Sequence, residues 1–220
     1  VALKESQKFV VPMLRWCSAK TAMESASPTL AAAFIETKAS SLSDHWVHVQ
    51  VVAMNRTLLD GMGIPTGRIA TCLAAPVLRR VMAAWCGLHS DHSSMMEVRL
   101  RRGEAAAPDV LDLALCVREE ARTAARQAAH DLAAHGRLFR TTFLPRLIRF
   151  ANPGSGTHCG SSFPMRERPH NLLDSDSLGR PFGWSRIFAV DSSVLPSIPG
   201  TTLAFSVMAN ASRIASLAPI

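Results

Sequence analysis

Two stretches near the C-terminal end carry most of the information about this chain: GSGTHCGSSFPM at residues 154–165 and FAVDSSVLPSIPGTTLAFSVMAN at residues 188–210. The first places one histidine, His158, in a loop of glycine and serine, where backbone can approach a ligand closely. The second runs through an Asp-Ser-Ser turn and a proline-stiffened turn into an apolar segment with helical spacing. The N-terminus of such a helix offers unpaired N–H groups and positive partial charge to an anion.

The same region predicts two regular elements. SRIFAV at residues 185–190 predicts a short buried strand, and LAFSVMANASRIASL at residues 203–217 predicts a terminal helix. The helical spacing predicts that four side chains of this helix point towards the core, namely Phe205, Met208, Ala209 and Ile214.

The preceding residues predict strands and helices in turn. Alternation of apolar residues in WVHVQVVAM (46–54) and MMEVRL (95–100) predicts two strands. The apolar, Ala-rich stretch at 70–84 favours a helix over a strand. The clearest pattern covers residues 108–135, where small apolar residues recur every three or four positions behind a proline in the first turn, and it predicts a long helix. Residues 4–24 fit either a helix or an extended arm.

Composition excludes several classes of protein. The 220 residues are 48% hydrophobic and 19% charged, which is typical of a globular chain and excludes disorder as the main state. Because no apolar, uncharged run reaches about 18 residues, we expect no membrane-spanning helix. The net charge of +7 is spread along the chain without interleaved aromatic residues, so we expect no nucleic-acid partner. Five widely spaced cysteines without a CxxC pair predict reduced, partly buried thiols.

Several short motifs are too incomplete to carry chemistry. GMGIPTG at residues 61–67 has threonine where a dinucleotide fingerprint needs its third glycine or alanine, so it predicts a plain turn. The pairs His45/His48 and His89/His92 lack the HExxH pattern, and two residues three apart on a strand point to opposite faces. We therefore expect no metal site. A GxSxG nucleophile elbow is also missing from the sequence.

Taken together, the two C-terminal stretches resemble the end of the glucose–methanol–choline (GMC) family of flavin-dependent oxidoreductases. That family has a His-x-x-Gly-Thr-x-x-Met motif, then a strand ending in Val-Asp-x-Ser, a proline-containing turn and the terminal helix. His158 and Met165 keep the spacing of the first motif, Asp191-Ser192-Ser193 matches the second, and residues 196–209 match the turn and helix. The segment LKESQK at residues 3–8 and Gln50 also resemble parts of the family's substrate domain.

The resemblance implies an α+β fold. Residues 1–150 would form part of a substrate-binding domain, an antiparallel sheet flanked by helices. Residues 151–220 would add the C-terminal strand and helix of the FAD domain and close the flavin site. The family's N-terminal FAD-binding domain is missing from this sequence. We therefore expect that domain to come from the same or a partner chain, and the isolated chain to be inactive with apolar surface exposed.

The resemblance also implies a chemistry. With FAD as cofactor, His158 would accept the hydroxyl proton of a small-molecule alcohol while hydride passes to the flavin. Thr202 falls on the second active-site position, where the family has His or Asn, so it would hydrogen-bond the substrate and not act as a base. The resemblance assigns cofactor binding to Asp191, Ser192, Thr202, Leu203 and Ala204. Gly160 stands one position earlier than the family's glycine.

Other interpretations stay open. His158 alone fits a structural loop histidine, and Asp191 fits a turn aspartate that caps its own backbone. The whole chain fits a non-catalytic binding or scaffold module that has lost the flavin domain, or a subunit that joins an FAD-bearing chain. The sequence does not distinguish an oxidase from a dehydrogenase. Because Val1 opens the sequence and no leader pattern follows, we expect a chain entered in its middle and a cytoplasmic protein.

Overall fold

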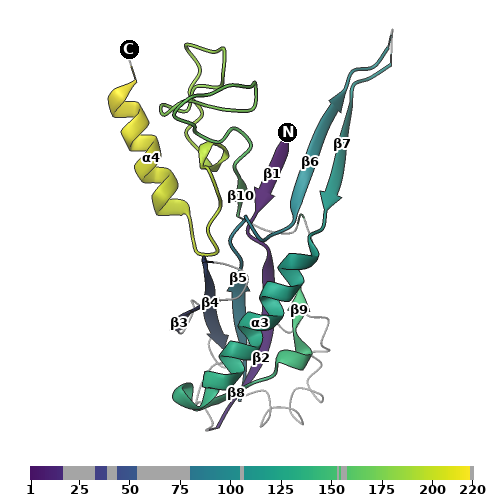
Figure 1. Ribbon diagram of the computed structural model, residues 1–220, viewed down its shortest axis with the longest axis vertical. Coiled ribbons are helices and arrows are strands. Elements are labelled where there is room, and N and C mark those ends of the chain that lie inside the picture. The colour runs from purple at the N-terminus through teal and green to yellow at the C-terminus, as the bar shows by residue number, and fades with distance from the viewer. Residues whose placement is uncertain are drawn as a thin grey trace, which may run out of the picture. The chain divides into compact units, whose positions relative to one another are not determined.

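The computed structural model describes residues 1–16, 33–38, 44–53, 80–104, 107–152, 154 and 158–218 (Figure 1). The chain divides into two compact units that alternate along the sequence. Unit 1 comprises Val1–Gln7, Gly87–Arg122 and Ala151–Ile220, and unit 2 comprises Lys8–Cys86 and Thr123–Phe150. This division is one of packing, not of function, so the expected functional boundary between residues 150 and 151 stays a prediction.

Unit 2 is built on a six-stranded sheet in the order β3-β4-β5-β2-β8, with β9 beside β2. Its strands are β2 (Lys8–Arg15), β3 (Ala33–Lys38), β4 (Trp46–Ala53), β5 (Val81–Gly87), β8 (Thr141–Phe143) and β9 (Arg149–Phe150). The β3–β4, β2–β8 and β2–β9 pairs are antiparallel. Two short 3-10 turns lie at Gly136–Phe139 and Pro145–Leu147.

The core of unit 2 is formed by buried residues that recur with the period of a strand in β4 and with the period of a helix in α3. Val47, Val49 and Val51 alternate along β4 and are buried, which confirms the strand predicted over residues 46–54. Helix α3 (Glu119–His135) buries a face of small side chains that includes Ala124 and Ala128. Small residues on that face allow the helix backbone to approach its neighbours closely.

Unit 1 contains a four-stranded antiparallel sheet in the order β10-β1-β6-β7. Its strands are β1 (Ala2–Glu5), β6 (Met95–Arg101), β7 (Val110–Cys116) and β10 (Cys159–Gly160). A long irregular segment then leads to the 3-10 turn η3 (Ser192–Val194) and helix α4 (Ala204–Leu217). The described residues thus form antiparallel sheets with two α-helices, which agrees with the predicted α+β class. Neither helix, nor any other within the described residues, is long and apolar enough to span a bilayer.

The long helix predicted over residues 108–135 is wrong in its first third. Residues 110–116 form strand β7, all seven of them paired with β6, and the helix begins only at Glu119. Leu111, Leu113 and Leu115 alternate with smaller or polar residues, and this period of two agrees with a strand. The helical spacing is real only from Ala121 onwards.

Two further predicted segments form strands in the structure. Residues 81–84, predicted as the end of a helix, belong to β5, while residues 70–79 lie outside the described part of the chain. A strand that is buried on both faces has a continuous run of apolar residues. The periodicity of apolar residues cannot distinguish such a run from a buried helix. Of the two interpretations of residues 4–24, the extended one is correct through Arg15, and residues 17–24 are not described.

At the C-terminal end, the predicted terminal helix is confirmed as α4, but its expected buried face is only partly right. Ile214 is buried, whereas Phe205 is 83% and Met208 64% exposed, and Ala209 is exposed as well. The strand predicted over residues 185–190 does not form. That segment is largely exposed, and the one backbone bond within the described chain that anchors it runs from the Ala189 amide to the Gly179 carbonyl, too little for a ladder.

Candidate functional site

The two motif stretches of the sequence run side by side in unit 1. The amide N–H groups of Ser161, Phe163 and Met165 donate to the carbonyl oxygens of residues 192–194 in order, each at 2.9 Å. The Ser192 hydroxyl also donates to the Cys159 carbonyl at 2.7 Å. This pairing places Ser192 next to the residue that follows His158, although the two segments are 33 positions apart.

Gly160 permits this close approach. A Cβ at this position would lie 2.3 Å from the Ser192 carbonyl oxygen and 2.9 Å from Cδ1 of Ile198. Real Cβ atoms essentially never come within 3.0 Å of another heavy atom, so any side chain here would force the segments apart. Glycine is therefore required by contact with a neighbouring backbone, not by a left-handed conformation.

His158 is half-buried and lies directly before β10. Its carbonyl oxygen accepts a hydrogen bond of 2.9 Å from the Ser6 amide, which ties the loop to the end of β1. This bond involves only the main chain and leaves both roles of the imidazole, catalytic base or structural residue, compatible with the fold.

Asp191 caps the turn that carries the second motif. Its Oδ1 accepts a 3.0 Å hydrogen bond from the Ser193 amide and another from the Ser193 hydroxyl. The structure therefore shows the backbone-capping role that the sequence left open for this aspartate. The cofactor role assigned to Asp191 and Ser192 by resemblance stays a prediction.

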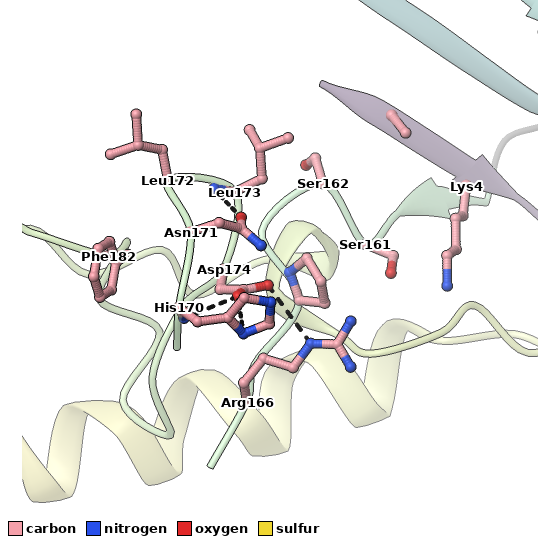
Figure 2. A pocket seen from close by; sticks show the side chains of 12 residues that line it. Lys4, Ser161, Ser162, Arg166, His170, Asn171, Leu172, Leu173, Asp174 and Phe182 are labelled. Atoms are coloured by element: carbon pink, nitrogen blue, oxygen red, sulfur yellow. Dashed lines mark hydrogen bonds and ion pairs between the residues drawn. The ribbon is translucent and has the colours of Figure 1, made fainter. Parts of the chain in front are cut away.

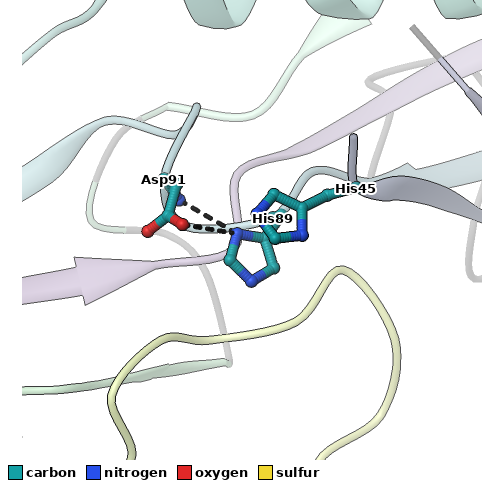
Figure 3. Close-up of side chains that lie close together, drawn as sticks. All are labelled: His45, His89 and Asp91. Carbon is teal, nitrogen blue, oxygen red and sulfur yellow. Dashed lines mark hydrogen bonds and ion pairs between the residues drawn. The ribbon is translucent and has the colours of Figure 1, made fainter. Parts of the chain in front are cut away.

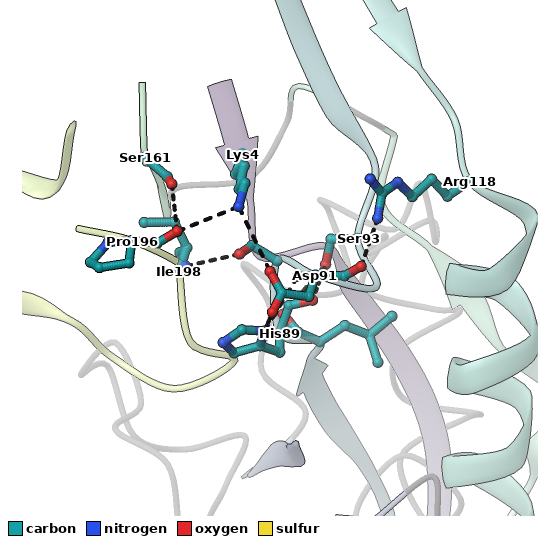
Figure 4. A network of polar contacts seen from close by, with 10 residues as sticks. Lys4, His89, Asp91, Ser93, Arg118, Ser161, Pro196 and Ile198 are labelled. Carbon is teal, nitrogen blue, oxygen red and sulfur yellow. Dashed lines mark hydrogen bonds and ion pairs between the residues drawn. The ribbon is translucent and has the colours of Figure 1, made fainter. Parts of the chain in front are cut away.

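The proline-containing turn, which includes Pro196 and Ile198 (Figure 4), is held by hydrogen bonds to other segments of unit 1. Ile198 is fully buried, its amide donates to the Ser90 Oγ at 2.9 Å, and its carbonyl accepts from the Ser90 amide at 2.9 Å. The carbonyl of Pro196 accepts from the Ser161 hydroxyl at 2.9 Å and from the Lys4 ammonium at 3.4 Å. Four segments of unit 1 are thus joined at this turn.

The proline-containing turn leads directly to the start of α4. Gly200 approaches Gly87 so closely that a Cβ would lie 2.3 Å from the Gly87 carbonyl oxygen. Leu203, the N-cap residue, supplies no side-chain hydrogen bond to the first turn of the helix. Thr202 and Ala204 flank it and are exposed. The predicted site residues thus fall into two groups, three at this helix N-terminus and three on the paired motifs.

The loop between β5 and β6 carries an ionic cluster around His89, a residue that the sequence singled out only as part of an HxxH pair. Asp91 lies 3.4 Å from Nδ1 of His89 and 3.8 Å from the Lys4 ammonium, and its carbonyl accepts from Arg118 at 2.6 Å (Figures 3 and 4). His48 is paired with a carboxylate in the same way, at 3.4 Å from Glu36. The expected lack of a metal site stays a prediction.

The same loop holds a buried serine cluster. Ser90, Ser93 and Ser94 are all buried, and Ser93 accepts from the Gln7 amide at 3.0 Å while its hydroxyl donates to the His89 carbonyl at 3.0 Å. The one local signal for this cluster is HSDHSS itself, a run of small polar residues between two apolar stretches. A run of this kind is usually a solvated loop, so its burial was not predictable.

The described thiols are all free. Cys86 is buried, and burial raises the pKa of its thiol, whereas Cys116 and Cys159 are exposed. The predicted partial burial therefore holds for Cys86 and is wrong for Cys116 and Cys159, while Cys17 and Cys72 lie outside the described residues.

Comparison with known proteins supports the fold. No family model matches the chain, and no curated protein matches it. Among solved structures, it is similar to the crystal structure of pyridoxine 4-oxidase from Mesorbium loti, with a TM-score of 0.58 and 13% sequence identity. The alignment covers 98% of this chain and 43% of that enzyme, so this chain spans less than half of its length. The fold of this chain therefore resembles the matching part of that enzyme, which is a GMC-family oxidoreductase.

Proposed function

We propose that this chain is the C-terminal part of an FAD-dependent oxidoreductase that oxidises the CH–OH group of a small-molecule alcohol. The observation that supports this most is the pairing of residues 161–165 with residues 192–194, which joins the two motifs that resemble the GMC flavin site. The GMC-like fold supports it independently of those motifs.

In this proposal His158 is the base. A neutral imidazole accepts the hydroxyl proton of the alcohol, and histidine suits this role because its pKa ordinarily lies near neutral pH. FAD supplies the hydride acceptor. Thr202 lacks a basic atom, so it orients the substrate through its hydroxyl and leaves proton removal to His158.

The described residues fit the flavin end of FAD. The start of α4 offers backbone N–H groups that the Leu203 side chain does not cap, and it is flanked by the exposed Thr202 and Ala204. A helix N-terminus carries positive partial charge, so it stabilises negative charge that develops on a bound ring system. Asp191 is exposed and Ser192 is half-buried in the same unit, and in this proposal their side chains would contact the ribityl and pyrophosphate groups.

A partner for this part of the chain is also proposed. Phe205 and Met208 project from α4 with most of their surface exposed. Contiguous apolar surface of this kind usually marks an interface. We propose that an N-terminal FAD-binding domain, on the same or a partner chain, covers it and supplies the site for the ADP half of the cofactor.

The experiment is a turnover assay on the full-length, flavin-loaded protein. His158→Ala should lower turnover at least about a hundredfold while the flavin stays bound, because a base is lost and no flavin contact is removed. Thr202→Ala should cost far less, since one hydrogen bond is lost. His130→Ala, which removes an exposed histidine from α3, is the control and should retain full turnover. Unchanged turnover in His158→Ala would exclude this residue as the base.

A non-catalytic scaffold is the second candidate. It is favoured by the internal bonds of Asp191 and Ser192, whose side chains both have partners within the chain without any cofactor. Absorbance separates the two candidates. A purified full-length protein with flavin absorbance supports the oxidoreductase, and a colourless protein that gains none on incubation with FAD supports the scaffold.

A further inference from the structure

A cavity of about 720 Å³ lies in unit 1, beside the segment that follows His158 (Figure 2). Three basic side chains line it, those of Lys4, Arg166 and His170, and one acidic side chain, that of Asp174. Its volume falls within the usual range of small-molecule sites, roughly 300–1,000 Å³. None of the functional residues predicted from the sequence lines this cavity.

The carboxylate of Asp174, which lines the cavity, already contacts two of the basic side chains. Asp174 is 3% exposed, accepts a 3.1 Å hydrogen bond from the His170 amide, and lies 3.2 Å from His170 Nδ1 and 3.6 Å from Arg166 Nε. The bond from the His170 amide, helped by the neighbouring positive charges, lowers the pKa of Asp174, so the carboxylate is ionised at neutral pH. Asp174 therefore orients Arg166 and His170 at the cavity wall.

Hydrogen-bond donors remain available in the cavity. Arg166 meets Asp174 through Nε, and its two Nη groups have no partner among the described residues. The side-chain Oδ1 of Asn171 accepts from the Leu173 amide at 2.8 Å, which leaves the side-chain NH₂ of Asn171 as a further donor. Lys4 on β1 donates one N–H of its ammonium group to the Pro196 carbonyl and lies 3.8 Å from Asp91, and an ammonium has three N–H donors in all. A guanidinium edge of this kind suits a carboxylate or phosphate, whose two oxygens it can bind together.

Apart from Ser161 and Ser162, the remaining lining residues are apolar. Leu172 is 74% exposed, and Leu173 and Phe182 are also exposed. Large apolar side chains at the mouth of a cavity, next to a few fixed polar groups, are typical of sites for ligands with an apolar body.

The wall is held in place despite its lack of regular secondary structure. The Phe182 amide donates to the Asp174 carbonyl at 2.9 Å, and the Arg166 amide donates to the Ser175 carbonyl at 2.8 Å. Ser175 in turn donates from its amide to Pro164 at 3.2 Å. These bonds fix the spacing between the charged and apolar sides before a ligand arrives, which lowers the entropic cost of binding.

We propose that this cavity binds a small organic anion, in which a carboxylate or a phosphate monoester is attached to an apolar body. Arg166 and Lys4 bind the anionic end, and Leu172 and Phe182 pack against the body. The inference uses residues of unit 1 alone and goes beyond the proposed flavin chemistry. Because binding is measured without turnover, its failure and that of the proposed function are distinguishable.

The test is calorimetric titration of the full-length protein with four probes: hexanoate, hexyl phosphate, inorganic phosphate and 1-hexanol. Hexanoate or hexyl phosphate should bind, and whichever binds more tightly assigns the anionic group. 1-Hexanol should bind at least about tenfold more weakly than the better anion, because it lacks the charge-assisted contacts. Leu172→Ala should weaken binding of that anion but not of inorganic phosphate.

Arg166→Gln should raise the Kd of the better anion at least about tenfold. Arg168→Gln is the matched control, because it removes the same charge two positions along the chain from an exposed residue that does not line the cavity. It should leave the Kd within about twofold. Equal weakening by both substitutions would assign binding to overall charge and overturn the proposal, as would the failure of both organic anions to bind.

Discussion

Replacing Gly160 with alanine should push apart the two paired motifs of unit 1. The new Cβ would lie 2.3 Å from the Ser192 carbonyl oxygen, whereas carbon–oxygen contacts are ordinarily about 3.3 Å or longer. One segment must therefore move by about 1 Å. The same Ser192 oxygen accepts the 2.9 Å hydrogen bond from the Ser161 amide, so that bond should be broken.

The size of the effect follows from these two losses. Overpacking against a rigid neighbour costs about 1–3 kcal/mol, and a lost hydrogen bond adds about 1 kcal/mol. Gly160 is not in the left-handed region, so alanine brings no further backbone penalty. The free energy of unfolding should therefore fall by about 2–4 kcal/mol.

Urea unfolding and amide hydrogen exchange measure this effect. Exchange should accelerate at Ser161 and Phe163, whose amides donate across the pairing. Cys159→Ala is the control: it changes an exposed side chain in the same strand, keeps the carbonyl that Ser192 uses, and should stay within about 0.5 kcal/mol of the original chain. A Gly160→Ala variant with unchanged stability and unchanged exchange at Ser161 would refute the close approach.

Three further expectations follow from other parts of the structure. Ser90→Ala removes the acceptor of the buried Ile198 amide and should lower the free energy of unfolding by about 1–3 kcal/mol in a urea titration, and a loss below about 0.5 kcal/mol would contradict that bond. With a thiol reagent at pH 8, Cys159→Ser should remove one rapidly labelled thiol and Cys86→Ser none, because Cys86 is buried and its thiol pKa is raised. The pKa of Asp174 is lowered in the folded chain, so its stabilising effect is present above the ordinary pKa of 3.8 and is lost as pH falls below it. Acid unfolding followed by circular dichroism should then be shallower in Asp174→Asn, and identical acid profiles would count against the paired carboxylate.

Local patterns were informative wherever one element's own residues determine its structure. The alternation of Val47, Val49 and Val51 predicted β4, because one face of that strand is buried and the other is not. The terminal helix was predictable from the helical spacing of its apolar residues, although Ile214 is the one residue of α4 that the described chain buries. The order and spacing of the two motifs also indicated a GMC-like fold before any tertiary contact was known.

Local patterns failed where a partner strand determined the outcome. Residues 110–116 carry both a helical and an alternating pattern, and pairing along the whole length of β6 stabilises the strand. Residues 185–190 have the composition of a strand but have no ladder of backbone bonds to join. The intrinsic preference of a residue for helix or strand is weak. Hydrogen bonding to a neighbouring strand overrides it in residues 110–116, and without such a neighbour residues 185–190 form no strand.

The sequence was thus sufficient for the α+β class, for β4 and α4, and for the motifs that carry the proposed flavin site. Long-range contacts were needed for the rest. They pair residues 161–165 with residues 192–194, bury Ser90 beneath the proline turn, and gather Arg166 and Lys4 around one cavity. The physical reason is that these hydrogen bonds and this cavity bring together atoms from distant positions in the sequence. The spacing of residues within one segment does not indicate which distant segment it will contact.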